Sequence, residues 1–332
     1  MRQTFKIFIL MATCIIGFIS QAQLLGSSDN SNNSTLVNAI GQELVILSVV
    51  KNSLTAELST LPSPGTLPRL LKKFQIALGK EDGDKEKQGD NRTPEGIYFT
   101  QHHIDGKTLP EKYGAFAIPI DFPNPIDQIQ GKTGYGIWLH GVENAQRISA
   151  AKVTEGCVAF YNEDISNLSK WLQPFQGIVA ISREKNQLNR QEDVAELMRN
   201  TEEWAQSWAK RDHANYINHY HEAFNTDGKN YRAYSEYKKR VFASYKVMDL
   251  RIDDIRVVTH PKYAVSIMNQ DFRGDQRFIS KGRKVLYWQK NSSGEYRIVN
   301  EGFQRKRFEK ISADQLEQLS VQKAEELKQS RL

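Results

Sequence analysis

The segments GIWLHG (residues 136–141) and TEGCV (residues 154–158) decide the interpretation of this chain. The first is a short apolar run typical of a β-strand, and it leads into His140. Cys157 follows 17 residues later, too far for one helical turn, but a strand and a neighbouring loop would bring the two side chains together. A thiol with an ordinary pKa of about 8.5 needs an adjacent imidazole to become a nucleophile. The two segments therefore predict a catalytic Cys157–His140 pair.

Two glycines beside this pair suggest how it is arranged. Gly141 follows His140 directly, and its backbone carbonyl could accept the second ring N–H in place of a carboxylate. Gly156 allows a sharp turn in which the amides of Gly156 and Cys157 point together at a developing oxyanion. Thr154 completes this oxyanion and substrate-contact set.

Four further side chains are candidate substrate contacts. Tyr135 and Trp138 flank His140 and would stack on substrate, although the alternation of a strand predicts that at least one of them is core. Arg92 and Lys132 are candidate partners for a substrate carboxylate.

The amino terminus predicts export. Arg2 and Lys6 accompany an apolar run over residues 7–19, and Ser20-Gln21-Ala22 offers a small-x-small cleavage site. We therefore expect a signal peptide over residues 1–22 and no membrane span after its removal. The alternative is an uncleaved anchor, which the short apolar run disfavours because a span needs about 20 residues.

Cysteine usage sharpens the expectation of export. Removal of the signal peptide would also remove Cys14, leaving Cys157 without an intramolecular partner. A lone cysteine can be a small buried hydrophobe. In an exported protein, and in this local sequence, we favour a nucleophile.

Composition limits the other classes of function. The 332 residues suggest roughly two domains, and 45 Lys and Arg against 39 Asp and Glu leave a modest charge of +6. This charge is compatible with an anionic polymer, but no zinc-finger, basic-zipper or RNA-binding motif accompanies it, so we expect no nucleic-acid partner. We expect no cofactor and no metal, because His213, His219 and His221 lack a Cys or carboxylate cluster, and the last two should face different sides of a helix.

The first half of the chain reads as β-rich. After a Ser- and Asn-rich lead-in over residues 23–42, we predict a domain over residues 43–184 with one helix at residues 162–172. Its expected strands lie at residues 43–50, 74–78, 97–100, 115–120, 136–139 and 177–181.

The second half changes to helices followed by strands. We predict an α+β domain over residues 193–305 and a helical tail over residues 306–332. Tyr216, Tyr220 and Phe224 have the spacing of one helix face and are expected in the core. A helix at residues 230–245 and strands at residues 247–258, 263–272, 284–289 and 296–299 follow, with a hairpin turn at residues 291–294. This half resembles the nuclear-transport-factor-two-like superfamily, which implies a cone-shaped α+β domain.

The first half resembles the L,D-transpeptidase family. A His-Gly pair followed by Ser/Thr-x-Gly-Cys is that family's catalytic signature, matched by His140-Gly141 and Thr154–Cys157, and NRTPEGIY (residues 91–98) resembles its Thr-Pro-x-Gly segment. The resemblance implies a β-sandwich in which Cys157 attacks peptidoglycan stem peptides, His140 is the base, the Gly141 carbonyl orients it, and a terminal D-Ala is released. It also implies the periplasm of a Gram-negative bacterium.

Two departures from the family pattern point to one branch of it. Glu155 and Ala159 stand where family members often have His and Arg. With the appended second domain, they make the chain similar to the cell-shape L,D-carboxypeptidases, in which water resolves the acyl-enzyme. Resolution by a stem-peptide amine, as in a transpeptidase, stays open.

Two rival functions have less support. A non-catalytic wall-binding scaffold would have no need for a lone exported thiol, and a cysteine protease would carry a papain-type motif that is missing. The second domain is expected to aid substrate positioning or to form a homodimer.

Overall fold

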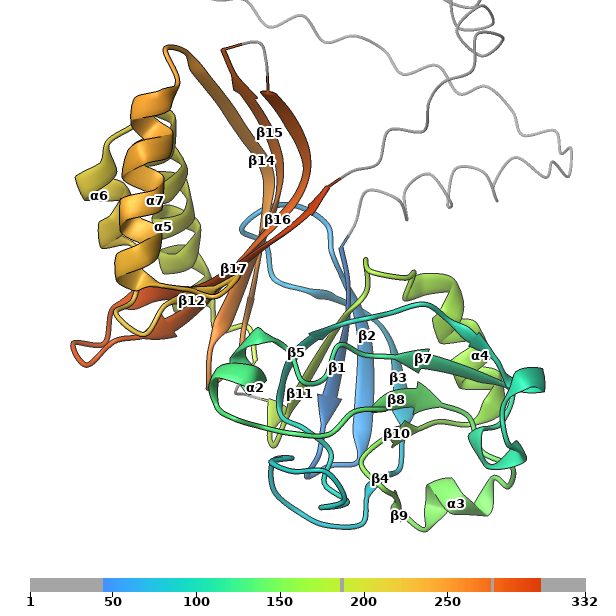
Figure 1. Cartoon of the computed structure of the whole chain (residues 1–332). Coiled ribbons are helices and arrows are strands. Elements are labelled where there is room, and N and C mark those ends of the chain that lie inside the picture. Colours follow the sequence, from blue (N-terminus) through green and yellow to red (C-terminus); the bar gives the residue numbers. More distant parts are fainter. Residues whose placement is uncertain (1–43, 186–187, 276–277, 306–332) are drawn as a thin grey trace, which may run out of the picture. The chain divides into compact units, whose positions relative to one another are not determined.

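The computed structural model describes residues 44–185, 188–275 and 278–305. The expected signal peptide, the lead-in and the tail over residues 306–332 lie outside the described residues. Within those residues, no helix has the length and apolar character that a membrane span requires. A strand-rich first domain is followed by a second domain of helices and one antiparallel sheet (Figure 1).

The first domain is built on two sheets. The larger has the order β3-β2-β1-β11-β5, with β1 Leu44–Val50, β2 Thr55–Leu61, β3 Arg69–Gln75, β5 Gly96–Phe99 and β11 Ile178–Ser182. The smaller has the order β10-β8-β7-β6, with β6 Ile104–Asp105, β7 Phe116–Pro119, β8 Trp138–His140 and β10 Val158–Ala159. The short strands β4 (Leu78–Gly79) and β9 (Lys152–Thr154) form a separate two-stranded sheet. The pairs β1–β11, β8–β10 and β4–β9 are parallel.

Short helices connect these strands. They are the 3-10 helices Gly106–Thr108 and Glu111–Tyr113, and the α-helices α2 Pro125–Ile129, α3 Gln146–Ser149 and α4 Asn162–Trp171. The start of α2 is fixed by a capping box, in which the Asn124 side chain accepts from the helix and the Asp127 side chain accepts from the Asn124 backbone.

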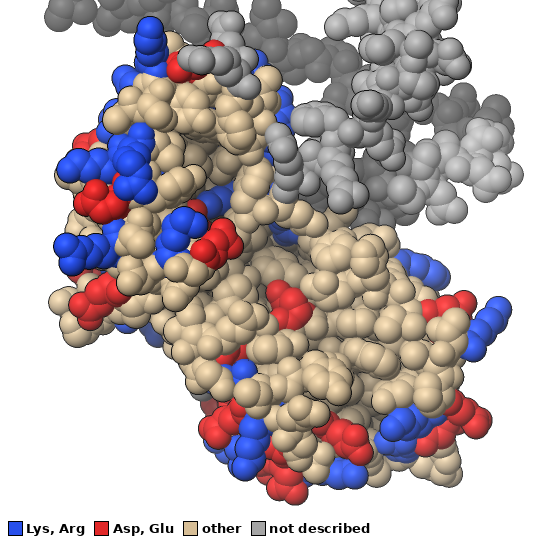
Figure 2. Space-filling model, in the orientation of Figure 1, with Lys and Arg blue, Asp and Glu red and all other residues tan. Residues whose placement is uncertain are grey.

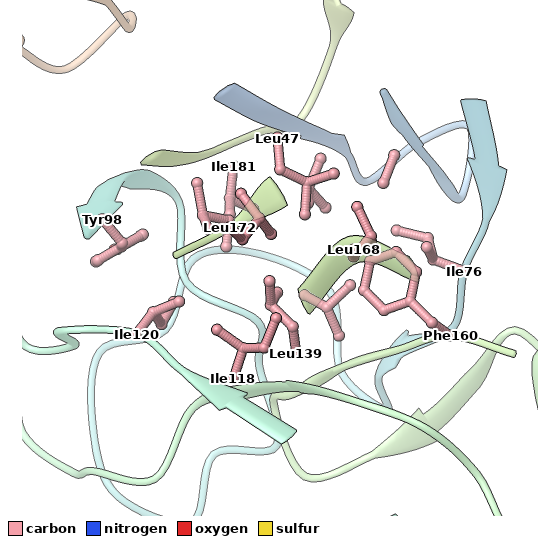
Figure 3. Close-up of a cluster of buried hydrophobic side chains, with 14 of the residues drawn as sticks. Leu47, Ile76, Tyr98, Ile118, Ile120, Leu139, Phe160, Leu168, Leu172 and Ile181 are labelled. Carbon is pink, nitrogen blue, oxygen red and sulfur yellow. The ribbon is translucent and has the colours of Figure 1, made fainter. Parts of the chain in front are cut away.

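A hydrophobic core joins the two sheets and α4 (Figure 3). Leu47 and Ile181 come from the larger sheet, Ile118 and Leu139 from the smaller one, and Leu168 from α4; none is more than 1% exposed. Burial of an aliphatic side chain of this size contributes about 1.5–3 kcal/mol. The two sheets thus share one core, and the expected β-sandwich is confirmed.

Each expected strand has a counterpart in the structure, but the short strands β6, β9 and β10 are not among the expected ones. The sequence pattern does not predict β2, and the strand expected at residues 74–78 is divided between the end of β3 and β4. β2 is buried on both faces, and its polar residues conceal it from a hydrophobic pattern. Glu57, for example, is 7% exposed because Lys185 Nζ lies 2.7 Å from its Oε2.

The second domain has helices on one face of a four-stranded sheet (Figure 1). The sheet is the antiparallel meander β14 (Met248–Thr259), β15 (Ala264–Gly274), β16 (Phe278–Lys290) and β17 (Tyr296–Arg305). The helices are α5 Gln191–Ala209, α6 His213–Asn218 and α7 Tyr231–Ser244, with the small hairpin β12 (Asn225–Thr226) and β13 (Lys229–Asn230). The expected α+β class is confirmed.

One helix of this domain is shorter than its aromatic spacing predicts. Tyr216, Tyr220 and Phe224 are all under 5% exposed and belong to the core as expected. The prediction that they share one helix face is wrong, because α6 ends at Asn218. Strand β17 hydrogen-bonds to the chain at this point. The Ile298 amide donates to the His219 carbonyl oxygen at 2.8 Å, and the Ile298 carbonyl oxygen accepts from the His221 amide. His219 is therefore in a turn.

Candidate active site

Parallel pairing of β8 with β10 brings the predicted cysteine and histidine together. Leu139 pairs with Val158 and His140 pairs with Ala159, so Cys157 lies beside Trp138 at the start of β10. The Trp138 backbone N–H donates to Cys157 Sγ at 3.4 Å. Cys157 and His140 line one cavity of about 620 Å³.

His140 is held in the tautomer that a base requires. Its Nδ1 lies 2.5 Å from the Gly141 carbonyl oxygen, the contact that the sequence predicts. A carbonyl only accepts, so Nδ1 carries the proton and Nε2 has a free lone pair. Burial lowers the pKa of His140 to about 4, against the opposing effect of this carbonyl, so the ring is neutral at neutral pH.

Cys157 rests as a thiol. It is 9% exposed, and burial raises its pKa to about 11, while the Trp138 N–H against the sulfur opposes the shift. Its Sγ donates to the Gly136 carbonyl at 3.4 Å. Because both groups are neutral, an attack by this sulfur would require it to lose its proton in the same step.

The turn before Cys157 requires a glycine but uses one expected oxyanion donor internally. Gly156 has φ +123°, and a Cβ there would lie 2.7 Å from the Arg92 carbonyl oxygen. The Gly156 amide donates to Thr154 Oγ1 at 3.2 Å, and that hydroxyl donates to the Cys157 carbonyl at 2.7 Å. Thr154 thus holds the turn, and the backbone amide of Cys157 is the remaining expected donor.

Aromatic side chains form one wall of the cavity. Tyr135 is 77% exposed and Trp138 is half-buried, so the prediction that at least one of them is core is wrong. Gly134 and Gly136 have φ of +111° and +74°, which breaks the alternation before β8 begins. The sequence reasoning missed Tyr113, whose ring centre lies 5.0 Å from that of Trp138 and 5.2 Å from that of His140. No motif marks it.

The two predicted carboxylate partners do not line the cavity. Lys132 Nζ lies 2.6 Å from Asp84 Oδ2 and 2.7 Å from Asp127 Oδ1, so its charge is used internally. Arg92 presents its backbone carbonyl to the Gly156 turn. The cations that do line the cavity include Lys80, Lys112 and Arg147.

The structure gives a physical reason for Ala159. This residue is fully buried, and its amide and carbonyl bond those of Ala77 at 2.8 and 3.0 Å. An arginine here would have to enter the core beside β4. Glu155 is exposed and lines the cavity. In the part of the chain that the structure describes, no group of three or more His, Cys, Asp or Glu side chains could hold a metal ion.

Charge is spread over the molecular surface. On the face shown in Figure 2, Lys and Arg side chains are interspersed with Asp and Glu over the described parts of both domains.

Comparison with known proteins agrees with this geometry. Residues 55–181 match the family model of the L,D-transpeptidase catalytic domain. The first domain is therefore L,D-transpeptidase-like. Residues 196–302 match the Cds6 C-terminal NTF2-like domain, so both expected resemblances are confirmed.

A curated relative and two solved structures extend the comparison. The chain is 29% identical over 172 residues to Escherichia coli (strain K12) YafK, named as an L,D-transpeptidase, across 50% of this chain and 63% of YafK. Bd1075 of Bdellovibrio bacteriovorus has a TM-score of 0.69 and 24% identity, covering 81% of this chain and 95% of its own. The helical cell shape determining protein Pgp2 of Campylobacter jejuni has a TM-score of 0.65 and 22% identity, covering 81% and 98%. The structural matches establish a shared fold that includes both domains.

Proposed function

We propose that this protein is an exported cysteine enzyme that cleaves peptidoglycan stem peptides at the L,D bond before a terminal D-Ala. The observation that carries the proposal is the placement of Cys157 and a correctly oriented His140 in one cavity of an L,D-transpeptidase domain. Similarity to that family supports the substrate class, and the lone thiol supports the chemistry.

The first half of the reaction forms a thioester. His140 Nε2 takes the proton of the Cys157 thiol while Sγ bonds to the carbonyl carbon of the L-centre. The carbonyl oxygen gains negative charge, which the Cys157 amide stabilises. The C–N bond then breaks, the protonated His140 gives its proton to the leaving amine, and D-Ala departs.

The second half releases the enzyme. A nucleophile gives a proton to His140 Nε2 and attacks the thioester carbon, and the departing Cys157 sulfur regains a proton. When the nucleophile is water, the product is a trimmed tripeptide and the enzyme is an L,D-carboxypeptidase. When it is a stem-peptide amine, the product is a cross-link and the enzyme is an L,D-transpeptidase.

Charge at the cavity supports an anionic substrate. Lys80 and Lys112 make no ion pair within the described residues, and Arg147 pairs only with Glu143, at 2.7 Å. Stem peptides carry free carboxylates, which such cations attract. These three residues replace the predicted Arg92 and Lys132 as proposed carboxylate contacts.

The cellular role follows from the same substrate. An enzyme of this class works on the wall outside the cytoplasm, so we propose a periplasmic location, reached through the signal peptide expected over residues 1–22. Pgp2 is named for helical cell shape, and the shared two-domain fold supports a role of this chain in wall remodelling and cell shape.

The proposal is tested on purified protein with disaccharide-tetrapeptide, analysed by liquid chromatography and mass spectrometry beside Cys157→Ala. We expect products that depend on Cys157. Trimmed tripeptide would identify the carboxypeptidase, and cross-linked dimer the transpeptidase. Identical, unchanged substrate in both samples would contradict the proposal and favour the scaffold alternative.

A further inference from the structure

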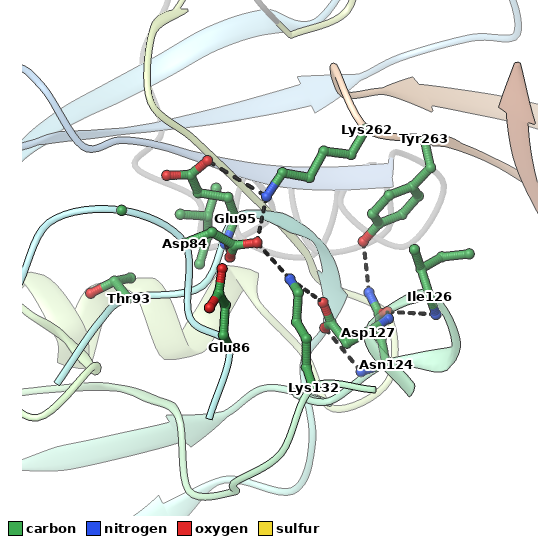
Figure 4. Close-up of polar contacts among 12 residues, drawn as sticks. Asp84, Glu86, Thr93, Glu95, Asn124, Ile126, Asp127, Lys132, Lys262 and Tyr263 are labelled. Carbon is green, nitrogen blue, oxygen red and sulfur yellow. Dashed lines mark hydrogen bonds and ion pairs between the residues drawn. The ribbon is translucent and has the colours of Figure 1, made fainter. Parts of the chain in front are cut away.

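The hairpin turn between β14 and β15 carries two side chains from the NTF2-like domain into the L,D-transpeptidase domain (Figure 4). Lys262 Nζ lies 2.5 Å from Asp84 Oδ2 and 3.7 Å from Glu95 Oε2. Tyr263 is 2% exposed and meets Asn124 and the backbone of Ile97.

Lys262 is part of a network of ion pairs. Asp84 Oδ2 also lies 2.6 Å from Lys132 Nζ, which lies 2.7 Å from Asp127 Oδ1. The side chains of Lys132 and Asp127 are only 7% and 2% exposed, so these charges are weakly screened and depend on one another. Lys262 thereby supplies part of the positive charge that holds Asp84 in place.

The Tyr263 hydroxyl has its full set of hydrogen bonds. It donates to Ile97 O at 2.9 Å, and it accepts from Ile97 N at 2.5 Å and Asn124 Nδ2 at 2.6 Å. A hydroxyl has one proton and two lone pairs, so no capacity is left for another partner. A Cβ on Gly96 would lie 2.7 Å from this oxygen. The Tyr263 hydroxyl can therefore come this close to the backbone only because residue 96 has no side chain.

The residues that Lys262 and Lys132 anchor run directly into the wall of the cavity. Lys85, Gln88 and Gly89 follow Asp84 and line the cavity, as do the residues from 134 to 138 that follow Lys132. The two segments are joined: Thr133 N donates to Glu86 O at 3.0 Å, and Gln88 N donates to Thr133 Oγ1 at 3.3 Å.

We propose that Lys262 and Tyr263 are positioning residues, through which the NTF2-like domain holds the cavity wall in the form that binds the substrate. The inference rests on the proposed function for its substrate. It assigns the second domain a part in supporting the cavity wall, since Lys262 adds a second cation to the pair that Asp84 makes with Lys132.

The test compares Lys262→Met with wild type in steady-state kinetics on disaccharide-tetrapeptide. We expect KM to rise about tenfold while kcat changes less than about twofold, because the segments that bind the substrate shift while the pairing of β8 with β10 keeps Cys157 near His140. Lys262→Arg should restore KM to within about twofold of wild type, since it keeps the charge. Tyr263→Phe keeps the ring and should also raise KM.

Lys281→Met is the matched control. Lys281 is exposed to a similar degree, 35% against 30%, and pairs with Asp271 at 2.6 Å within the second domain. Its KM should stay at the wild-type value. An unchanged KM in Lys262→Met, or an equal rise in Lys281→Met, would overturn the proposal.

A second readout separates this proposal from the proposed function. If wild-type protein does not act on the muropeptide, the function fails, and positioning is then judged by the rate at which iodoacetamide alkylates Cys157. If loss of Lys262 loosens the cavity wall, Cys157 becomes more accessible. The alkylation rate should then be about threefold higher in Lys262→Met and unchanged in Lys281→Met. Equal rates in both variants would overturn the positioning role.

Discussion

At the scale of single residues, the proposed catalytic pair is neutral before substrate binds. Burial raises the pKa of Cys157 to about 11 and lowers that of His140 to about 4. Between these values the thiol keeps its proton and the imidazole lacks one. We therefore propose that the nucleophile forms during the attack and not as a resting thiolate–imidazolium pair.

This state predicts how the free protein reacts with iodoacetamide. Only the thiolate reacts, and below the pKa its fraction rises about tenfold per pH unit. We expect the alkylation rate of Cys157 to be low at pH 7 and to rise with nearly that slope toward pH 10, as followed by mass spectrometry. A rate that is already high and flat from pH 6 to 9 would show a preformed ion pair.

The sequence predicts these residues because their signal is local. His140-Gly141 and the turn before Cys157 are short segments whose geometry depends on adjacent residues. Tyr113 and the cations of the cavity reach it through the tertiary fold, which no spacing in the sequence reveals. Lys132 has the charge expected of a substrate partner, but buried carboxylates on other segments use it.

At the scale of elements, Asn162 at the start of α4 ties together the segments around His140. Its Oδ1 accepts from Ala115 N at 3.0 Å and Val142 N at 3.1 Å, and its Nδ2 donates to Val142 O at 2.8 Å. A Cβ on Gly141 would lie 2.1 Å from this oxygen, so the packing leaves room only for glycine.

We therefore expect Asn162→Ala to destabilise the protein by about 1–2 kcal/mol, since two backbone amides lose their acceptor. Turnover should also fall, because Gly141 orients His140. Asn162→Asp keeps the acceptor and should lose less on both measures. Urea unfolding and muropeptide turnover would check this, and equal losses in the two variants would contradict the role of the acceptor.

The sequence predicts helices and strands correctly where their apolar residues form a continuous run or a clear helical period. β1 and β11 are continuous apolar runs, and α4 has a helical period, so their patterns suffice. β2 contains polar residues whose partners are brought near only by folding. α6 ends where the backbone of the following residues hydrogen-bonds to β17. Both outcomes depend on partners distant in sequence.

At the scale of the whole molecule, the two domains share buried apolar surface. One hydrophobic cluster contains Ile46, Ile97 and Ile126 of the L,D-transpeptidase domain together with Val258 and Tyr287 of the NTF2-like domain. All five are under 5% exposed. Separation of the domains would expose this cluster to water.

A shared cluster predicts cooperative unfolding. We expect a single transition in differential scanning calorimetry, with the calorimetric and van't Hoff enthalpies in agreement. Replacing Ile97 by Ala should lower the one midpoint by creating a cavity, at a cost of about 2–5 kcal/mol. Two separate transitions, of which Ile97→Ala moves only one, would contradict the coupling of the domains.

The proposed mechanism requires a covalent acyl-enzyme between Cys157 and a stem peptide. Its most direct test is intact-protein mass spectrometry of the enzyme mixed with disaccharide-tetrapeptide and quenched in acid, followed by peptide mapping. We expect an adduct of the substrate minus D-Ala on the peptide that contains Cys157, and none in Cys157→Ala. Turnover that continues in Cys157→Ala, or an adduct on another residue, would contradict it.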